Sequence, residues 1–458
     1  MPLRDAARTA CISRAFLRSW RCHPNLTFTK KTLGLDESTC GKDEVERELT
    51  NRVDQIMRYH SGIGVKAFKL ESYDFLNARY LNRWLQIVVT PRIEELTLIL
   101  HDIYKEKRYN FPCSLLFNMS RNSIMYLRLV DCAFHPTVGL HCLRTLHLSM
   151  VCTTGDDLGC FLSDSFNLEQ LILTYCGEIN CLKTPCLLRR LCYLKVVGCK
   201  ALKEIDIKAP NLSTFFYDGY LIHISLGHSL KVKNLEISCY FQSDVIQYTC
   251  DKLSSIVPNI ETLSIHSFCE TVNAPIVPFR FLHLKYLEIS FNGHGSFSPT
   301  YDYFSLVYFL EASPILETFS LTVSQTRMKH DVISKDSSHL RQMPEHRHDK
   351  IKNVKIIGFC SAKSMIELTC YILETATSLQ YLTLDTICND YENADRLSAH
   401  RIGGCGRICR YMIREAEKAL LAIETYIVGK VPSSVKLDVL KPCSWCHVGN
   451  KSLGSQVP

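Results

Sequence analysis

The sequence predicts an α/β fold: a solenoid whose short repeats each contribute one strand to a curved parallel sheet. The first observation is a spacing in which an aliphatic residue is followed by others at +3 and +5, as in Leu168, Leu171 and Leu173. The second is that this spacing recurs twelve times, at steps of about 20 to 35 residues. The third is a cysteine at +8 in three of the repeats. These features are the signature of a leucine-rich repeat, and twelve matches in rough period are too many for chance.

A strand is expected in each repeat because side chains at +3 and +5 share one face of an extended chain. A single strand cannot bury its own apolar face, so the repeats must stack. One further match, Leu202/Ile205/Ile207, falls between two others, and we interpret it as a strand on the return side. The twelve repeats begin at Ile93, Ile124, Leu143, Leu168, Leu191, Leu212, Val232, Ile260, Leu284, Leu316, Ile351 and Leu379.

Position +8 carries the second signal. In leucine-rich repeats this residue is Asn or Cys, and its side chain stabilises the turn after the strand. The residues found there are Cys132, Cys176, Cys199 and Asn292. This explains part of the count of 23 cysteines without disulfides. Because no apolar signal segment follows Met1 and no apolar run reaches the roughly 18 residues of a membrane span, we expect reduced thiols in the nucleus or cytoplasm.

The repeat pattern also sets the expected domain order. A helix is expected near Lys42–Tyr59, ahead of the first repeat. The strand pattern stops after Asp385, and an amphipathic helix at 408–428 is expected to cap the open end of the solenoid. The four predicted segments are a helical segment at 1–28, a helical linker and lead-in at 29–90, the solenoid at 91–386, and a C-terminal cap and tail at 387–458.

A loop at 324–350 is expected to be inserted between two repeats, because it has little apolar periodicity. It contains a basic cluster that could contact an acidic partner, although a solvated loop is the simpler interpretation. The cluster consists of His339, Arg341, His346, Arg347 and His348.

The charge of the chain is unevenly spread. The net charge is +7, and residues 1–31 hold seven Lys and Arg against one Asp, an excess of +6. The rest of the chain is almost neutral, so it carries no footprint of nucleic-acid binding.

No residues arranged for catalysis are found. The chain lacks a Gly-rich phosphate loop, paired catalytic carboxylates and a nucleophile elbow, so we expect no enzyme and no cofactor. The sequence Cys443-Ser444-Trp445-Cys446-His447 has the form of a haem-attachment motif, but export is not indicated. A zinc site needs four ligands. Cys443, Cys446 and His447 offer three, and Cys405 and Cys409 are possible additions. A packed loop with reduced thiols is the simplest interpretation, so no metal is expected.

The segment 1–28 allows three interpretations: a mitochondrial presequence, a solvated basic helix, and a resemblance. The run from Pro2 to Trp20 resembles the second half of a plant F-box, with a helix from about Asp5 that ends at His23-Pro24. The first half of an F-box, which opens with a Leu-Pro dipeptide, is absent, so the F-box is expected to be truncated. The resemblance implies contact with a Skp-type linker through Pro2, Leu3, Ala6, Ala10, Ile12, Leu17 and Trp20.

Three other regions are similar to plant F-box/LRR-repeat proteins that end in an FBD region. Residues 60–70 resemble the segment leading into their repeats, and residues 203–212 resemble their recurring Ala-Pro-Asn-Leu unit. Residues 367–385 and the later helical run 419–428 resemble the FBD end. The matching regions follow one another in the family's order over most of the chain.

The resemblance implies a substrate-recognition subunit of an SCF-type cullin–RING ubiquitin ligase, which would bind the linker, a cullin and a target protein and do no chemistry. The alternative is an LRR interaction scaffold uncoupled from ubiquitination, and a third, weaker class is a small-ligand receptor. The target is expected on the concave face, formed by the residues on either side of each +3 aliphatic. The chosen residues are Tyr126, Arg128, His147, Gln170, Tyr193, Lys195, Phe216, Glu236, Tyr286, Glu288 and Tyr381.

Overall fold

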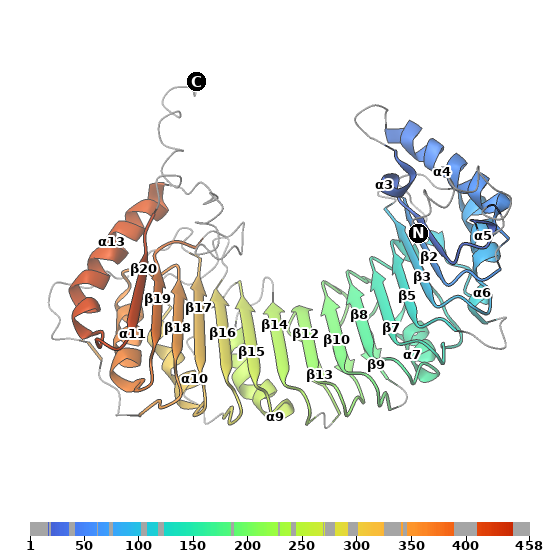
Figure 1. Ribbon diagram of the computed structural model, residues 1–458. Coiled ribbons are helices and arrows are strands. Elements are labelled where there is room, and N and C mark those ends of the chain that lie inside the picture. Colours follow the sequence, from blue (N-terminus) through green and yellow to red (C-terminus); the bar gives the residue numbers. More distant parts are fainter. Residues whose placement is uncertain are drawn as a thin grey trace, which may run out of the picture. The chain divides into compact units, whose positions relative to one another are not determined.

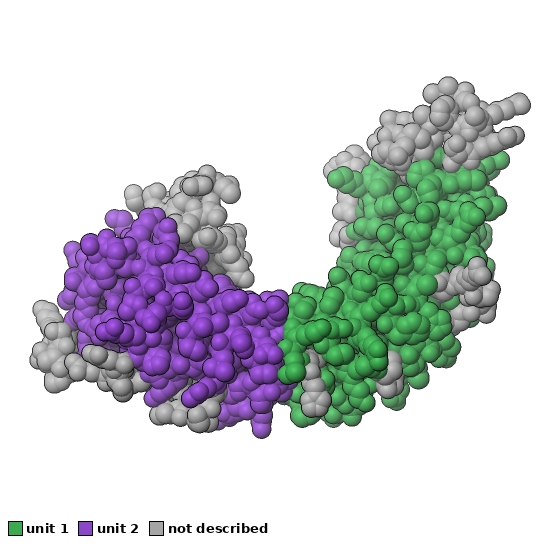
Figure 2. Space-filling model, turned by 60° about the horizontal axis from the view of Figure 1, so that its bottom comes forward, with its two compact units in different colours: residues 1–231 green, residues 232–458 purple. Residues whose placement is uncertain are grey.

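The structure is a computed structural model, and it confirms the predicted fold class. It describes residues 17, 20–35, 42–61, 63–72, 77–101, 108–117, 123–184, 187–227, 230–239, 244–268, 270, 280–291, 301–324, 340–341, 346–388 and 410–442. Over these residues the main sheet has 15 strands, and the strand pairs that are described run parallel (Figure 1). The chain forms two compact units, residues 1–231 and 232–458 (Figure 2).

Unit 1 contributes eight strands to the sheet, in the order β1-β2-β3-β5-β7-β8-β10-β12. Its helices are short, apart from α4 and α5. The strands of this sheet are β1 (Asn25–Phe28), β2 (Ala67–Ser72), β3 (Glu95–Leu100), β5 (Tyr126–Val130), β7 (Thr145–Ser149), β8 (Gln170–Thr174), β10 (Tyr193–Val197) and β12 (Thr214–Gly219). The helices are α3 (Lys30–Leu33), α4 (Lys42–Tyr59), α5 (Ala78–Val88), α6 (Ser114–Phe117) and α7 (Gly155–Ser163).

The return side of unit 1 is built largely from very short strands. β9 (Cys181–Lys183), β11 (Glu204–Asp206) and β13 (His223–Ser225) form a parallel three-stranded sheet, and β4 (Tyr109–Asn110) pairs with β6 (Cys132–Ala133). β11 contains Ile205, so the extra match between two repeats is a return strand, as predicted. The helix expected at 42–59 is α4.

Unit 2 contributes seven strands, in the order β14-β15-β16-β17-β18-β19-β20. Its return side is helical. The strands are β14 (Asn234–Cys239), β15 (Thr262–Ser267), β16 (Tyr286–Phe291), β17 (Thr318–Val323), β18 (Asn353–Ile357), β19 (Tyr381–Asp385) and β20 (Lys436–Leu440). The helices are α8 (Val245–Tyr248), η1 (Thr249–Leu253), α9 (Ser254–Ile256), η2 (Tyr303–Leu306), α10 (Val307–Glu311), α11 (Lys363–Thr375), α13 (Arg410–Tyr426) and η4 (Val428–Lys430).

The core lies between the sheet and the return segments. The +3 and +5 side chains of neighbouring strands stack in register, as Leu171 and Leu173 of β8 do on Leu194 and Val196 of β10. All four are fully buried. Truncating one such leucine to alanine typically costs about 2–5 kcal/mol. Each repeat contacts mainly its neighbours, so this stacking is what holds consecutive repeats together.

Three strands of the sheet lie outside the range 91–386 expected for the repeats: β1, β2 and β20. The expectation that the strand pattern stops after Asp385 is wrong, because β20 pairs with β19. β2 has the full spacing at Val65, Phe68 and Leu70. β20 has a polar Ser434 where the first aliphatic would stand, which hid it from the pattern.

The helix predicted at 408–428 is α13, which begins at Arg410 and ends at Tyr426. Met412, Ile413 and Ala416 of this helix form a buried cluster with Ile387, which follows β19. The helix therefore packs beside the end of β19, and β20 follows it in the chain. No helix among the described residues is both long and apolar enough to cross a lipid bilayer.

Candidate protein-binding face

The side chains at +2 and +4 of each strand point away from the core and form what we call the open face of the sheet. In β8, for example, Gln170 is exposed and Ile172 half-buried, whereas Leu171 and Leu173 are buried. The alternation follows from the period of two in a strand. The eleven residues predicted to contact a partner all stand at these positions. Seven are in unit 1 (Tyr126, Arg128, His147, Gln170, Tyr193, Lys195 and Phe216) and four in unit 2 (Glu236, Tyr286, Glu288 and Tyr381). That they bind a partner stays a prediction.

The +4 positions of β5, β7 and β10 bring three cationic or titratable side chains into one row. Parallel pairing aligns Arg128 of β5 with His147 of β7, and His147, through Ile172, with Lys195 of β10. Burial, together with the positive charges of Arg128 and Lys195, lowers the pKa of His147 to about 4. The imidazole is therefore neutral at pH 7, and the row carries two fixed positive charges. The Lys195 ammonium lies 4.4 Å from the centre of the Phe216 ring.

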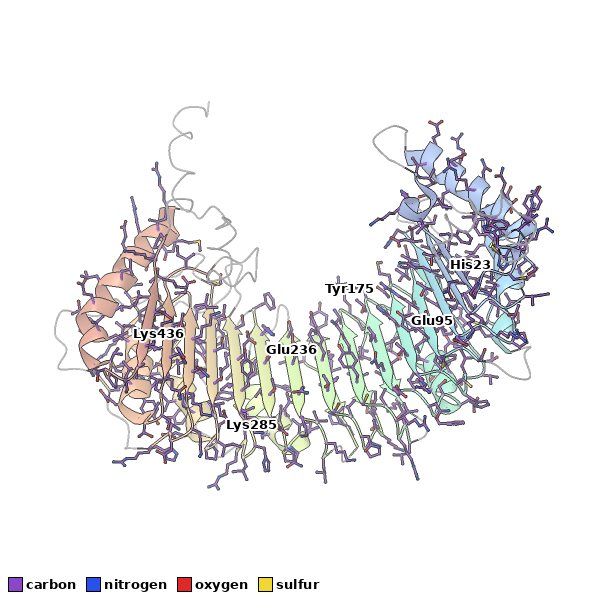
Figure 3. All side chains as sticks on the ribbon, viewed as in Figure 1. His23, Glu95, Tyr175, Glu236, Lys285 and Lys436 are labelled. Atoms are coloured by element: carbon purple, nitrogen blue, oxygen red, sulfur yellow. The ribbon has the colours of Figure 1, made fainter. Side chains whose placement is uncertain are left out.

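The open face of unit 2 has carboxylates with partners. Glu236 Oε1 lies 3.5 Å from His266 Nε2 on the neighbouring strand. Glu288 Oε2 accepts hydrogen bonds from Ser264 Oγ and Tyr286 Oη, both at 3.3 Å. These side chains hold one another in place across the strands. Figure 3 labels Glu236 in the middle of its strand.

A charge ladder at +1 runs along the starts of the strands in unit 2. Lys233 and Lys285 lie 2.8 and 3.1 Å from the two oxygens of Glu261, and Lys352 lies 2.9 Å from Glu317. Lys285 is at the lower end of its strand in Figure 3. The flanking lysines lower the pKa of Glu261. Sequence reasoning missed this ladder, although alternating charge signs at one repeat position would have indicated it.

The turns after the strands confirm part of the prediction for position +8. Cys176 Sγ lies 3.6 Å from the carbonyl oxygen of Leu148, and Cys199 Sγ lies 3.7 Å from that of Val197. These thiols therefore satisfy carbonyls at the strand ends. Burial raises the pKa of Cys132, which keeps that thiol protonated. Asn292 lies outside the described residues. All 15 cysteines in the described part of the chain are free thiols.

Position +7, which the sequence pattern did not single out, is left-handed in several repeats. φ is 56° at Asp131, 53° at Met150, 54° at Tyr175 and 62° at Gly198. In Figure 3 Tyr175 stands just beyond the end of its strand. The left-handed residue turns the chain from the sheet toward the return side, and only glycine adopts this conformation without strain.

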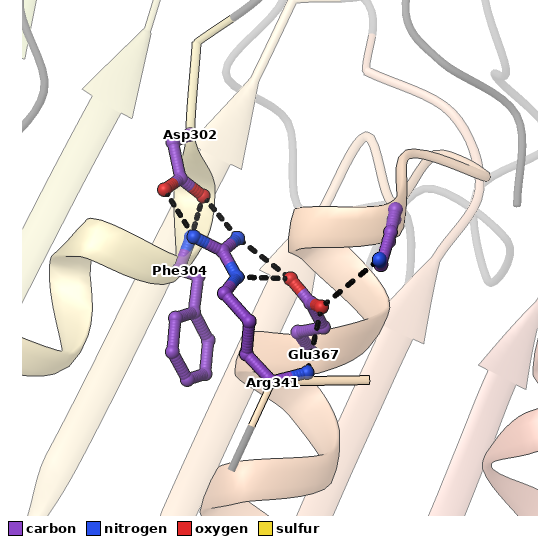
Figure 4. Close-up of polar contacts among 5 residues, drawn as sticks. Asp302, Phe304, Arg341 and Glu367 are labelled. Carbon is purple, nitrogen blue, oxygen red and sulfur yellow. Dashed lines mark hydrogen bonds and ion pairs between the residues drawn. The ribbon is translucent and has the colours of Figure 1, made fainter. Parts of the chain in front are cut away.

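Most of the loop expected at 324–350 lies outside the described residues, but Arg341 and His348 of its basic cluster are built into unit 2, which corrects both interpretations for these two residues. Arg341 forms two 2.6 Å contacts with the Asp302 carboxylate and bonds of 2.8 and 2.6 Å with Glu367 (Figure 4). Its guanidinium also lies 4.6 Å from the Phe304 ring centre. Arg341 therefore already has two acidic partners within this chain.

The second half of this cluster is divided between the interior and the surface. His348 is buried, with Nε2 3.1 Å from Tyr371 Oη, and burial lowers its pKa to about 4. His346 and Arg347 are exposed, and His339 lies outside the described residues. The cluster is therefore not one basic surface.

The segment resembling an F-box is largely outside the description. Pro2, Leu3, Ala6, Ala10 and Ile12 are not described. Leu17 and Trp20 are half-buried, and β1 begins at Asn25, inside the range 1–28 predicted for that segment.

Within the described residues, no three or more His, Cys, Asp and Glu side chains are grouped so as to hold a metal ion. The candidate ligands named from the sequence, Cys405, Cys409, Cys443, Cys446 and His447, lie outside those residues.

Comparison with known proteins identifies the architecture. Residues 56–444 match the family model of the At1g61320/AtMIF1 LRR domain. The F-box/FBD/LRR-repeat protein At1g13570 of Arabidopsis thaliana is 23% identical over 407 residues, which cover 85% of this chain and 88% of that protein. The FBD-associated F-box protein At1g61320 of the same plant is 23% identical over 379 residues, 78% of this chain and 80% of that protein. The F-box/LRR-repeat protein At5g02910, also from Arabidopsis thaliana, is 23% identical over 315 residues, 63% of this chain and 62% of that protein.

These matches confirm the resemblance to plant F-box/LRR-repeat proteins of the FBD type. The family match spans the repeats of both units and most of the C-terminal part. This chain belongs to the family of the At1g61320/AtMIF1 LRR domain.

Proposed function

We propose that this protein is a substrate-recognition subunit of an SCF-type cullin–RING ubiquitin ligase. The observation that carries the proposal is that the three relatives are named F-box proteins and align over 63 to 85% of this chain. In this role the chain does no chemistry, because ubiquitin transfer belongs to the conjugating enzyme. Its working place would be the nucleus or the cytoplasm.

The open face supplies the surface for a target. Tyrosine and arginine are enriched among the residues that dominate binding energy at interfaces. Tyr126, Arg128 and Tyr193 combine these residue types on neighbouring parts of unit 1, and all three are half-buried, so a partner would cover side chains that are already partly ordered. Tyr381 of unit 2 is 49% exposed and is a further candidate contact.

Binding to the rest of the ligase would depend on residues 1–28. In the proposal Pro2, Leu3, Ala6, Ala10, Ile12, Leu17 and Trp20 would contact the Skp-type linker, which in turn binds the cullin.

The test is a pull-down of the chain with purified Skp-type linker. Binding that Leu17→Asp abolishes, and that Tyr193→Ala leaves unchanged, supports the adaptor role. The same assay is then run on the chain extended upstream by the complete F-box of a relative. Binding by the extended chain alone favours the alternative, in which the chain as given is an LRR interaction scaffold. Failure of both forms to bind contradicts the assignment of residues 1–28 to an F-box.

A further inference from the structure

Three residues of unit 1, Arg128, His147 and Lys195, form what we call the basic row. They stand at +4 of β5, β7 and β10, and the pairing register places them on one line across the strands. Neighbouring strands are about 4.8 Å apart, so the three strand steps from Arg128 to Lys195 span about 14 Å. The row is a property of the strand register, not of a flexible loop.

The two cations of the basic row have no acidic partner among the described residues. Arg128 Nε is buried and makes no hydrogen bond there. The Lys195 ammonium contacts the ring of Phe216 and forms no salt bridge with a described residue. Leaving a buried donor unsatisfied costs about 1–3 kcal/mol, so such a group calls for an explanation. An anion that arrives with a partner would supply the missing acceptor.

No acidic residue of unit 1 stands in line with the row at +4. Across unit 1 the other +4 residues of the aligned strands are Thr27, Lys69, Thr97, Ile172 and Phe216, and none is acidic. The lowered pKa of His147 has the same origin, since burial and both cations oppose a third positive charge. In unit 2, by contrast, Glu236 and Glu288 occupy the +4 position.

The spacing of the row selects the shape of its partner. Residues four apart in an extended peptide are separated by about 13 Å, close to the distance from Arg128 to Lys195. Carboxylates at such positions would reach both cations. The ring of Phe216, half-buried one strand beyond Lys195, and the aromatic side chains of Tyr126 and Tyr193 at +2 offer apolar contacts beside the charges. Phosphate-rich nucleic acid fits less well, because outside residues 1–31 the chain is almost neutral.

We infer that the basic row binds an extended acidic segment of a protein partner, with carboxylates four residues apart on Arg128 and Lys195 and an apolar side chain on Phe216. This inference rests on the proposed function, because it names the chemistry of the target that the open face would hold. It also goes further, since it predicts an acidic recognition sequence and assigns it to unit 1.

The experiment measures fluorescence anisotropy of a labelled twelve-residue peptide that has Glu at positions 4 and 8 and Leu at position 10. The full chain is titrated into this probe, into the same peptide with Gln at both Glu positions, and into a labelled twelve-nucleotide single strand. We expect the Glu peptide to bind at least tenfold more tightly than the Gln peptide, with the difference shrinking between 50 and 200 mM salt, as for charge pairs at an interface.

The variant Arg128→Gln/Lys195→Gln is expected to weaken binding of the Glu peptide about tenfold or more. The matched control is Lys200→Gln/Lys203→Gln, which removes the same charge from exposed residues between β10 and β11 and should change binding less than twofold. Lys195→Gln alone tests the row if the double variant fails to fold. A further check is Arg128→Glu/Lys195→Glu, which should prefer a peptide with Lys at positions 4 and 8.

Equal binding of the Glu and Gln peptides, or an equal loss in the control variant, overturns the inference. Tighter binding of the oligonucleotide than of the Glu peptide, lost in the row variant, also overturns it in favour of nucleic acid. The assay contains no linker subunit, so its result is independent of ligase coupling. Peptide binding without linker binding would support the basic row and contradict the adaptor role. Linker binding without peptide binding would support the adaptor role and contradict the inference about the basic row.

Discussion

Unit 1 and unit 2 use the same strand signature and differ in the segments that connect one strand to the next. In unit 1 the repeats that begin at Leu143, Leu168 and Leu191 follow one another at 25, 23 and 21 residues, whereas those from Ile260 to Ile351 are 24, 32 and 35 residues apart. The repeats of 23 and 21 residues return by the three-residue strands β9 and β11, whereas the 25-residue repeat from Leu143 returns by α7 and the 32-residue repeat from Leu284 returns by α10. A strand advances about 3.3 Å per residue and a helix only 1.5 Å, so a helical return needs more residues.

The two units also differ in whether their charged side chains at +4 have partners within the chain. Arg128 and Lys195 at +4 in unit 1 have no acidic partner in the described part of the chain, whereas Glu236 and Glu288 of unit 2 are held by neighbours on the face. Ion pairs at +1 occur in both units, as Lys66–Glu94 in unit 1 and as the charge ladder in unit 2, and unit 2 also has the Arg341 network. The comparison indicates that the +4 carboxylates of unit 2 serve internal cohesion, whereas Arg128 and Lys195 of unit 1 are available to a partner.

The largest expected effect tests the turn at +7. In Gly358→Ala of unit 2, a Cβ would overlap the carbonyl oxygen of Val323 in a backbone with φ of 73°. We expect a loss of about 3–5 kcal/mol in the free energy of unfolding, from left-handed strain and overpacking together. In Gly198→Ala of unit 1 the obstacle is the ring of the exposed Tyr175, which can move, so about 1–2 kcal/mol is expected.

Urea unfolding measures both variants, and hydrogen exchange of the β17 and β18 amides localises the loss for Gly358→Ala. Equal losses in the two variants would contradict the distinction between a backbone obstacle and a side-chain obstacle.

The second prediction concerns the buried Glu270 of unit 2. Burial raises its pKa to about 7, and the charge of Asp244 contributes, although Ser267 donates a 2.8 Å hydrogen bond. The folded state therefore binds this proton more tightly than the unfolded chain. Its contribution to stability is full below about pH 4.5 and is lost as the pH rises to about 7. Glu270→Gln should raise the free energy of unfolding at pH 8 by about 3 kcal/mol.

The same substitution should change little at pH 4.5, where the carboxyl is protonated in the folded state and about half protonated in the unfolded chain. Urea unfolding of both proteins at several pH values gives the result. A variant whose advantage does not grow between pH 4.5 and pH 8 would show that Glu270 is not a buried, titrating carboxyl.

The third prediction tests the internal use of charge in unit 2. Arg341→Ala leaves the buried carboxylate of Glu367 with Lys363, 3.9 Å away, as its remaining cationic partner among the described residues. Because the Arg341 side chain is 46% exposed, we expect the free energy of unfolding to fall by roughly 2–3 kcal/mol, less than for a fully buried pair. Arg347→Ala, an exposed neighbour, is the matched control and should lie within about 0.5 kcal/mol of the parent. If thermal unfolding does not distinguish the two variants, Arg341 does not stabilise unit 2.

The smallest effect is expected for the exposed charge ladder. The flanking lysines lower the pKa of Glu261, so its contribution to stability is present above the unfolded pKa of about 4.5 and is lost as the pH falls through the lower folded value. Glu261→Gln should reduce the urea midpoint slightly at pH 7 and low salt, and the difference should vanish at 1 M salt. Glu424→Gln on α13 is the control. A salt-independent difference would mean that the ladder acts through packing.

Much of the fold could be predicted from the sequence, because the twelve spacings report a local fact: which side chains of a strand face the core. The return strand with Ile205 and the placement of the eleven open-face residues followed from the same periodicity. β20 was missed because Ser434 interrupts the spacing, and β20 has only β19 beside it. A strand at the edge of the sheet buries less apolar surface, so its pattern is weaker.

Chain periodicity by itself determined the solenoid, the register of its strands and which residues share the open face, since these depend on side-chain alternation and on stacking of like positions. Only the tertiary structure decided which charges meet. Asp302 and Glu367 lie 39 and 26 residues from Arg341 in the chain, yet all three form one network. Arg128 and Lys195 lie on one line across the strands, with no acidic partner among the described residues. The physical reason is that an ion pair depends on distances across repeats, and the lengths and paths of the return segments set those distances.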